Sequence, residues 1–180
     1  MTDEEIMEAV KNGDLLKLTV LFERYNKAIF NFLVRMTMNR DMAEDLTQNV
    51  FLRIIKYKAS YKSGLRFQSW LYQVARNVFS DHYQKHKNKV NDFVDVEKVG
   101  DYIVDEDESH EQHEREVLLQ KSMALLPEEQ RELLVLTRFQ HLKYEQVAVI
   151  MNTTEANIKV KVHRAIARLR EHYFELEKQN

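Results

Sequence analysis

Aromatic and positively charged side chains alternate in one stretch of the chain, residues 53–89. This stretch holds nine lysines and arginines against a single acidic residue, Asp81. Its rings are those of Tyr57, Tyr61, Phe67, Trp70, Tyr72, Phe79 and Tyr83. Aromatic rings stack on unpaired bases, while lysine and arginine side chains follow the phosphate backbone. The combination predicts a surface that holds single-stranded or extruded nucleotides.

The rings of this stretch are not all expected at the surface. Trp70 shares a helical stripe with Val74 and Val78, so we expect it in the core. The better surface candidates are Tyr61, Phe67 and Tyr72. The polar run 83–89, which includes Lys85 and Lys87, follows directly and is predicted to contact phosphates.

A second candidate for nucleic-acid binding lies in residues 144–170. Residues 144–151 have apolar side chains at helical spacing, and Asn152 can adopt the left-handed conformation of a turn. Thr154 is then placed to cap a helix that begins at Glu155. One face of that helix is apolar, with Ile158, Val162, Ala165, Ile166 and Leu169. The opposite face carries Ala156, Val160, His163 and Arg164, flanked by Lys159, Lys161, Arg168 and Arg170.

A helix that is buried on one side and basic on the other, preceded by a shorter helix and a tight turn, fits the major groove of duplex DNA. Small residues at its front permit close approach to base edges. The alternative is a surface helix with a solvated basic face, but the preceding helix and the turn favour DNA binding.

The elements that must position these groups are helices. Three glycines and one proline in 180 residues exclude an ordinary sandwich or barrel, which needs frequent turns. Helical periodicity is expected over residues 3–35 with a break at 12–14, and over 41–57, 67–87, 110–126, 128–139, 144–151 and 155–177. Asp14 and Asp41 are the expected N-caps of two of these helices.

The charge distribution divides the chain. Net charge is −3 over residues 1–52, +8 over 53–89, −9 over 90–116 and +2 over 117–180. We therefore predict an all-α protein with two small helical domains, residues 1–89 and 111–180. An acidic flexible linker, residues 90–110, would join them, and the second domain would be a helix-turn-helix. The −9 segment cannot follow DNA, because phosphates repel it. It could occupy a positively charged protein channel or act as a solvated spacer.

Other classes of protein fit poorly. The chain has no cysteine, no apolar run near the length of a bilayer span, and an acidic rather than basic first segment, so we expect a cytoplasmic protein. His110 and His113 are three residues apart, whereas a zinc-protease helix needs histidines four apart. The glycines are isolated and form no phosphate-binding loop. We predict no catalytic residue, metal or cofactor.

Five short segments carry a resemblance to a known family. They are residues 45–51, 67–77, 126–131, 144–148 and 157–165, in this order along the chain. Together they resemble the extracytoplasmic-function (ECF) sigma factors of bacterial RNA polymerase over nearly the whole chain. One such segment is weak evidence, but five in the right order and spacing are specific.

The resemblance implies roles for particular residues. The helix with Asp45, Gln48, Asn49 and Leu52 is similar to the region that binds core RNA polymerase. A second region of the family captures unpaired bases of the promoter's −10 element. Asn77 matches the residue at its flipped-base pocket, which Tyr61 and the loop through Leu65 would help to form. The same region includes Phe67, Tyr72 and the basic tail with Lys85 and Lys87. The −35 duplex would be read by Lys159, Val160, Lys161, His163 and Arg164.

The resemblance also implies partners: core RNA polymerase, promoter DNA and an anti-sigma factor, with no membrane insertion by this chain. The first domain would recruit polymerase and stabilise melted −10 bases, and the linker would thread the polymerase channel. The rival reading is a conventional repressor or activator, which binds duplex DNA unaided and usually as a dimer on paired half-sites.

Overall fold

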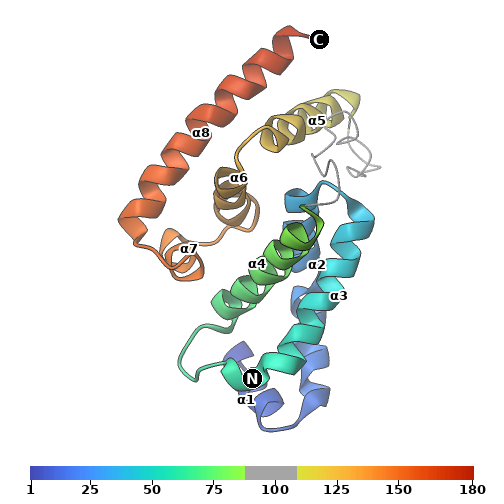
Figure 1. Cartoon of the computed structure of the whole chain (residues 1–180), viewed down its shortest axis with the longest axis vertical. Helices are drawn as coiled ribbons and strands as arrows, with labels where there is room; N and C mark the ends of the chain where they lie inside the picture. The colour runs from blue at the N-terminus through green and yellow to red at the C-terminus, as the bar shows by residue number, and fades with distance from the viewer. Residues whose placement is uncertain (88–108) are drawn as a thin grey trace.

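The computed structural model describes residues 1–87 and 109–180, so Lys89 and most of the expected linker lie outside the described residues. Every regular element within these two ranges is helical (Figure 1). In chain order they are α1 (Asp3–Lys11), η1 (Leu15–Lys17), α2 (Leu18–Thr37), α3 (Arg40–Tyr57), η2 (Lys58–Ser60), α4 (Phe67–His86), α5 (His110–Ala124), α6 (Glu128–Leu134), η4 (Val135–Phe139), α7 (Tyr144–Ile150) and α8 (Glu155–Lys178). Elements η1 and η2 are 3₁₀ turns and η4 is a π-helical turn. The all-α prediction is confirmed.

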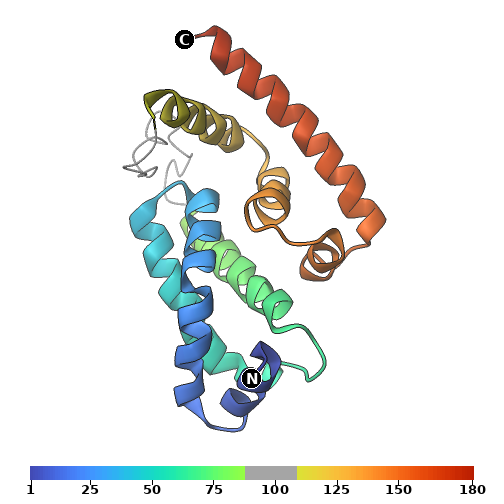
Figure 2. The ribbon, with the colours of Figure 1, turned by 180° about the vertical axis from the view of Figure 1, so that it is seen from behind.

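Helices α1 to α4 form the first bundle. Apolar residues recur at three- and four-residue steps, so each helix buries one stripe against its neighbours. Phe32 of α2, Ile54 of α3 and Leu71 of α4 are fully buried at the centre. Trp70 is also buried, as its stripe predicts. Helix α3 packs against both α2 and α4, while α1 lies across the lower end of the bundle (Figures 1 and 2).

Two helix starts differ from the expected ones. The side chain of Asn39 accepts a hydrogen bond from the backbone N–H of Met42 at 3.0 Å, so Asn39, not Asp41, is the N-cap of α3. Met38 lies in the left-handed region at φ 53°, and this residue turns the chain from α2 into α3. Asp14 holds the N-cap position of the η1 turn, where its side chain makes no capping hydrogen bond. Helix α2 begins four residues later at Leu18, with Lys17 in its N-cap position.

Helices α5 to α8 form the second bundle. Ser109 and Gln112 form a capping box that starts α5, close to where helix was expected to resume. Leu133, Val147 and Ile158 are fully buried in the core of this bundle. Helix α8 has 24 residues and runs along α5, α6 and α7 (Figures 1 and 2).

The two bundles contact each other. Helix α4 of the first packs on α7 of the second, and α2 packs on η4. Both ribbon views show α4 facing the short helices α6 and α7 (Figures 1 and 2). Among the described residues, no helix is both long and apolar enough to cross a membrane.

Candidate nucleic-acid interface

The turn between α7 and α8 has the predicted geometry. Asn152 lies in the left-handed region at φ 53°. The Thr154 side chain caps α8 by accepting a hydrogen bond from the backbone N–H of Asn157 at 3.2 Å. The Asn157 side chain in turn donates to the Thr153 hydroxyl at 2.7 Å. These bonds fix the angle at which α8 leaves the turn.

The two faces of α8 are divided as the sequence predicts. Ile158, Val162 and Ala165 are buried against the other helices of the bundle, with at most 1% of each side chain exposed. The four residues predicted for the outward face are exposed: Ala156, Val160, His163 and Arg164. Lys159 is exposed beside them.

Lys161 differs from the other predicted −35 residues. Its ammonium group is ion-paired with Glu129 at the start of α6, and its side chain is half-buried at the edge of the outward face. The structure therefore gives Lys161 a contact within the domain, which the spacing along α8 does not reveal.

A hollow of about 440 Å³ lies beside the outward face of α8. It is lined by Arg138, Tyr144, Lys159, Val160, His163 and Arg164, among others. The guanidinium of Arg138 donates to the Tyr144 hydroxyl at 3.2 Å, which adds a further cation at this edge. Arg138 was not predicted as part of the site, because it lies outside the helix-turn-helix. The hollow with its cationic rim suits the phosphates and base edges of duplex DNA.

The first bundle presents Asn77 and a basic tail. Asn77 is exposed on α4 although its neighbours Ala75, Val78 and Phe79 are buried. Lys85 and Lys87 at the end of α4 are exposed as well. The loop 62–66 between η2 and α4 is exposed throughout and turns at Gly64, whose φ of +90° suits glycine.

The prediction that Tyr61, Phe67 and Tyr72 lie at the surface is wrong. Tyr61 and Tyr72 are 1% exposed and Phe67 is 0% exposed, so none offers a face to a base. Tyr61 and Phe67 pack edge to face with each other, and Tyr72 packs on Phe32 in the same way. Burial raises the pKa of the Tyr61 and Tyr72 hydroxyls. These rings build the core beneath the loop, and Tyr61 donates to the Leu65 carbonyl at 2.6 Å, which closes the loop.

Other side chains of the basic stretch are exposed in their place. Tyr57 is 47%, Leu65 42% and Tyr83 42% exposed. The Tyr83 ring stacks on Phe79 at 6.1 Å between ring centroids, so one of its faces is covered by the protein. Tyr57 and Tyr83 belong to the aromatic pattern in the sequence, but the pattern does not separate them from the buried rings.

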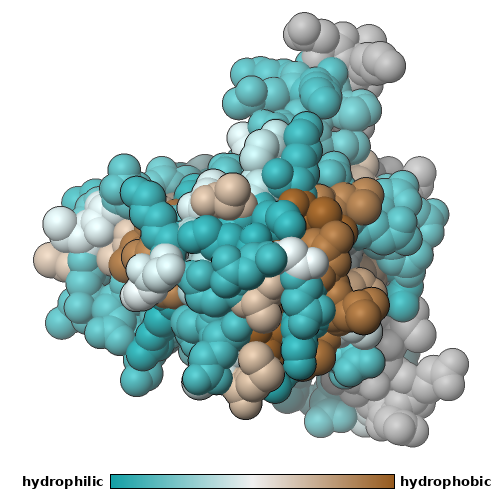
Figure 3. Space-filling view, turned by 90° about the horizontal axis from the view of Figure 1, so that it is seen from below, coloured by the Kyte–Doolittle hydropathy of each residue, from teal (hydrophilic) through white to brown (hydrophobic). Residues whose placement is uncertain are grey.

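Helix α3 presents the residues expected to bind polymerase along one stripe. Asp45, Gln48 and Leu52 are exposed and Asn49 is half-buried. Leu52 is 65% exposed. Further exposed apolar side chains of this bundle lie on η1, α2 and α3, and they are Leu15, Leu16, Phe22 and Ile55. Viewed from the end of the first bundle, hydrophobic side chains gather in one area of an otherwise hydrophilic surface (Figure 3). Such an area typically marks a protein-binding surface.

One face of α4 is covered by the second bundle. The Arg76 guanidinium pairs with the buried carboxylate of Glu132 and donates to the Ile150 carbonyl at 3.1 Å. Gln73 donates to the Val149 carbonyl at 3.1 Å. Burial raises the pKa of Glu132, and the Arg76 cation opposes this shift.

Four further contacts join the bundles. Tyr72 donates through its hydroxyl to the Gln140 side chain at 2.6 Å, and Gln146 donates to Gln68 at 3.1 Å. Arg35 of α2 lies over the Phe139 ring at 3.8 Å and pairs with Glu116 of α5. The sequence contains no periodic signal for these contacts, because they join segments that are distant along the chain.

Two families match the chain. Sigma-70 region 2 matches residues 21–89, and Sigma-70 region 4 matches residues 116–169. Among curated proteins, the chain is 35% identical to the ECF RNA polymerase sigma factor SigM of Bacillus subtilis, over 85% of this chain and 93% of that protein. It is 29% identical to the RNA polymerase sigma factor CarQ of Myxococcus xanthus, over 95% of this chain and 97% of that protein.

Solved structures show the same fold. CnrH, solved in complex with the cytosolic domain of CnrY, superposes with a TM-score of 0.71 at 15% identity, over 94% of this chain and 95% of that one. The sigma factor RpoE of Bartonella quintana, solved with the anti-sigma factor NepR, gives 0.67 at 22% identity, over 86% and 94%.

The helix-turn-helix, the first bundle and these matches define one class, the sigma-70-type transcription initiation factors. Within it, the chain belongs to the ECF sigma factors, which direct RNA polymerase to start transcription at particular promoters. The family predicted from the five sequence segments is confirmed.

Proposed function

We propose that this chain places its two bundles on the two elements of a promoter, with the domains divided as 1–89, 90–110 and 111–180. The observation that carries the proposal is α8, which is buried on one side and exposes Val160, His163 and Arg164 on the other, after a capped turn. This face reads the −35 duplex. Lys159 adds a phosphate contact at its edge, and Lys161 joins once its pairing with Glu129 opens.

The −10 element is held by the first bundle. Asn77, the exposed loop 62–66 and the cations Lys85 and Lys87 form the surface for unpaired nucleotides. Tyr83 and Leu65 supply the exposed apolar contacts. Tyr61, Phe67 and Tyr72 act from beneath, because their packing gives the loop and the start of α4 their shape.

Core RNA polymerase binds the exposed stripe of α3. Asp45 and Gln48 offer polar contacts, and Leu52 with the neighbouring hydrophobic area offers apolar surface. Asn49 contributes at the half-buried edge of the stripe. Polymerase carries out the chemistry, and this chain acts in the cytoplasm as a binding factor without catalytic residues of its own.

The contact between the bundles opens when promoter DNA is bound. Arg76 and Gln73 lie on the helix that carries Asn77, and both are engaged by the second bundle. A guanidinium that pairs with a carboxylate is not free to pair with a phosphate. Separation of the bundles therefore releases two polar side chains next to the −10 surface.

An anti-sigma factor is the proposed regulator. The structural relative RpoE was solved with the anti-sigma factor NepR, and CnrH was solved with the cytosolic domain of CnrY. The exposed apolar side chains of η1, α2 and α3 offer surface that a protein partner would cover. A partner on this surface would compete with polymerase for the same residues.

Gel-shift experiments separate this function from that of a repressor. We expect the chain together with core polymerase to bind promoter duplex at physiological salt. The chain without polymerase should bind the same duplex at least roughly tenfold more weakly. Polymerase without the chain and a promoter-free duplex serve as controls. Tight duplex binding that polymerase does not change would instead indicate a repressor or activator.

A further inference from the structure

Helix α1 faces the loop before α4 with one polar stripe. Glu4, Glu8 and Lys11 are spaced at i, i+4 and i+7, which places them on one side of the helix. The neighbouring side of α1 is buried in the first bundle, through Ile6, Met7 and Val10. The packing of the apolar side therefore aims the polar stripe at residues 61–67.

Each residue of the stripe contacts a different part of this segment. Lys11 donates through Nζ to the Tyr61 carbonyl at 2.8 Å. Glu8 accepts a hydrogen bond from the Ser63 hydroxyl. Glu4 accepts one from the backbone N–H of Phe67 at 3.0 Å. The loop is thus held at its beginning, its middle and its end.

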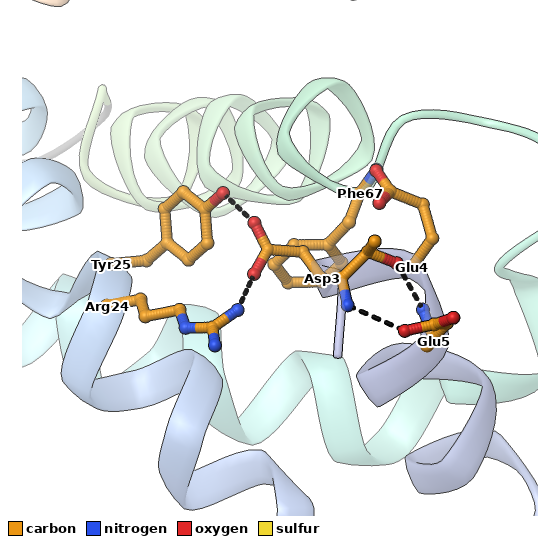
Figure 4. Close-up of polar contacts among 7 residues, drawn as sticks. Asp3, Glu4, Glu5, Arg24, Tyr25 and Phe67 are labelled. Carbon is orange, nitrogen blue, oxygen red and sulfur yellow. Dashed lines mark hydrogen bonds and ion pairs between the residues drawn. The ribbon is translucent and has the colours of Figure 1, made fainter.

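The contact of Glu4 replaces a missing helix cap. Arg66 is the N-cap residue of α4, and its side chain makes no capping hydrogen bond. The first N–H groups of a helix have no partner within the helix, and a carboxylate there also interacts favourably with the helix dipole. Glu4 supplies this carboxylate from another helix, so the start of α4 depends on α1 (Figure 4).

Helix α1 is itself anchored to α2. Asp3 pairs with Arg24 at 2.5 Å and accepts a hydrogen bond from the Tyr25 hydroxyl (Figure 4). Burial and this hydrogen bond raise the pKa of Tyr25, so its hydroxyl stays protonated as a donor. The stripe is therefore fixed relative to the bundle that carries Asn77.

We propose that α1 is a positioning element for base selection at the −10 element. Glu4, Glu8 and Lys11 hold the loop so that its exposed side chains meet the nucleotides in one geometry. Those side chains include Lys62, Leu65 and Arg66. This inference rests on the proposed function of the loop. All three positioning residues precede residues 21–89, the part that matches Sigma-70 region 2.

The test uses the full chain with core polymerase and promoters that differ at single −10 bases. The variant Glu4→Ala with Lys11→Met removes two contacts of the stripe, and Glu4→Gln with Lys11→Arg keeps an acceptor and a donor at the same places. Glu5→Ala is the control for α1 stability, because Glu5 bonds Thr2 within α1 rather than the loop. The readout is the ratio of transcription from the preferred and the altered −10 sequences, with polymerase affinity measured in parallel.

We expect the first variant to lower this ratio by about three- to tenfold. This is the effect that the loss of one or two capping-type hydrogen bonds would have. Polymerase affinity should stay unchanged, and the conservative variant should restore the ratio. The Glu5→Ala control should leave the ratio intact. An unchanged ratio in the first variant, or a loss shared equally by all promoters, overturns the inference.

A second measurement does not depend on transcription. Hydrogen exchange at the amides of residues 61–67 should accelerate in the variant with Glu4→Ala and Lys11→Met, while amides in α3 keep their wild-type rates. Unchanged exchange over 61–67 would overturn the positioning role. If the wild-type chain showed no −10 preference while this exchange result held, the proposed function would fail and the structural role of α1 would stand.

Discussion

At the scale of single residues, Asn77 is an exposed amide on a helix whose neighbouring positions are largely buried. Ala75, Val78 and Phe79 form the core side of α4, and Asn77 points away from them. An amide carries both donors and acceptors, so it can bond the edge of an extruded base. Because the side chain is exposed, its removal leaves the fold intact.

Asn77→Ala should therefore lower the rate of open-complex formation by roughly tenfold, which is the loss of one good hydrogen bond to a base. The affinity for core polymerase should not change, since α3 carries that contact. The measurement is fluorescence of 2-aminopurine placed in the −10 element, with polymerase affinity as the control. An equal loss of both quantities would argue against a role at the −10 bases.

The raised pKa of Glu132 predicts how the stability of the fold depends on pH. Burial raises its pKa, so the folded chain holds this proton more tightly than the unfolded chain does. Its contribution to the free energy of unfolding is greatest below the usual glutamate pKa and falls as the pH rises through the raised value. Glu132→Gln removes this dependence. The melting temperature of wild type relative to this variant should therefore decrease across that window, and a flat difference would contradict the assignment.

The residue scale also shows the limit of sequence reasoning. The helical stripe of Trp70 correctly predicts its place in the core. The role of Asn77 follows only from the family resemblance, and its side chain is exposed. The sequence does not reveal that Tyr61, Phe67 and Tyr72 are buried, because tyrosine and phenylalanine serve equally as core rings and as stacking surfaces. Their burial depends on α1 and α2, which lie far from them along the chain.

At the scale of elements, α8 was predicted almost completely. Three features of this helix are local: the cap at Thr154, the left-handed turn at Asn152 and the buried stripe. Each depends only on residues close together in the sequence, so the sequence predicts it well. The start of α3 was less well predicted, because Asn39 and Asp41 are both acceptable caps and the left-handed Met38 decides between them.

Lys159→Ala should weaken docking on −35 duplex and reduce the slope of log affinity against log salt by about one charge. Lys178→Ala is the matched control, since it removes the same charge from the far end of α8. Affinity should be measured at several salt concentrations by fluorescence anisotropy with polymerase present. An equal effect of both variants would mean that the charge acts through the overall field rather than at the −35 face.

At the scale of the whole molecule, the two bundles share a polar contact that the sequence did not predict. No motif or spacing in the sequence predicts that Arg76 pairs with Glu132. The ion pair forms because α4 packs against the second bundle. Both partners are charged and half or more buried, so removing one leaves the other uncompensated. The contact keeps α4 covered in the chain without DNA.

Arg76→Glu should open this arrangement and increase the radius of gyration in small-angle X-ray scattering, because it places two carboxylates together. Adding Glu132→Arg restores opposite charges and should return the radius of gyration toward the wild-type value. Circular dichroism checks that the helices stay folded. A wild-type scattering curve for the single variant would show that the pair does not hold the bundles together.

Run-off transcription shows whether this chain directs RNA polymerase to particular promoters. Purified core polymerase is combined with this chain and a library of promoter fragments, and the 5′ ends of the transcripts are sequenced. We expect transcripts to start at defined positions downstream of a shared pair of −35 and −10 elements, and these starts should disappear when the chain is omitted. Starts that are the same with and without the chain would contradict it.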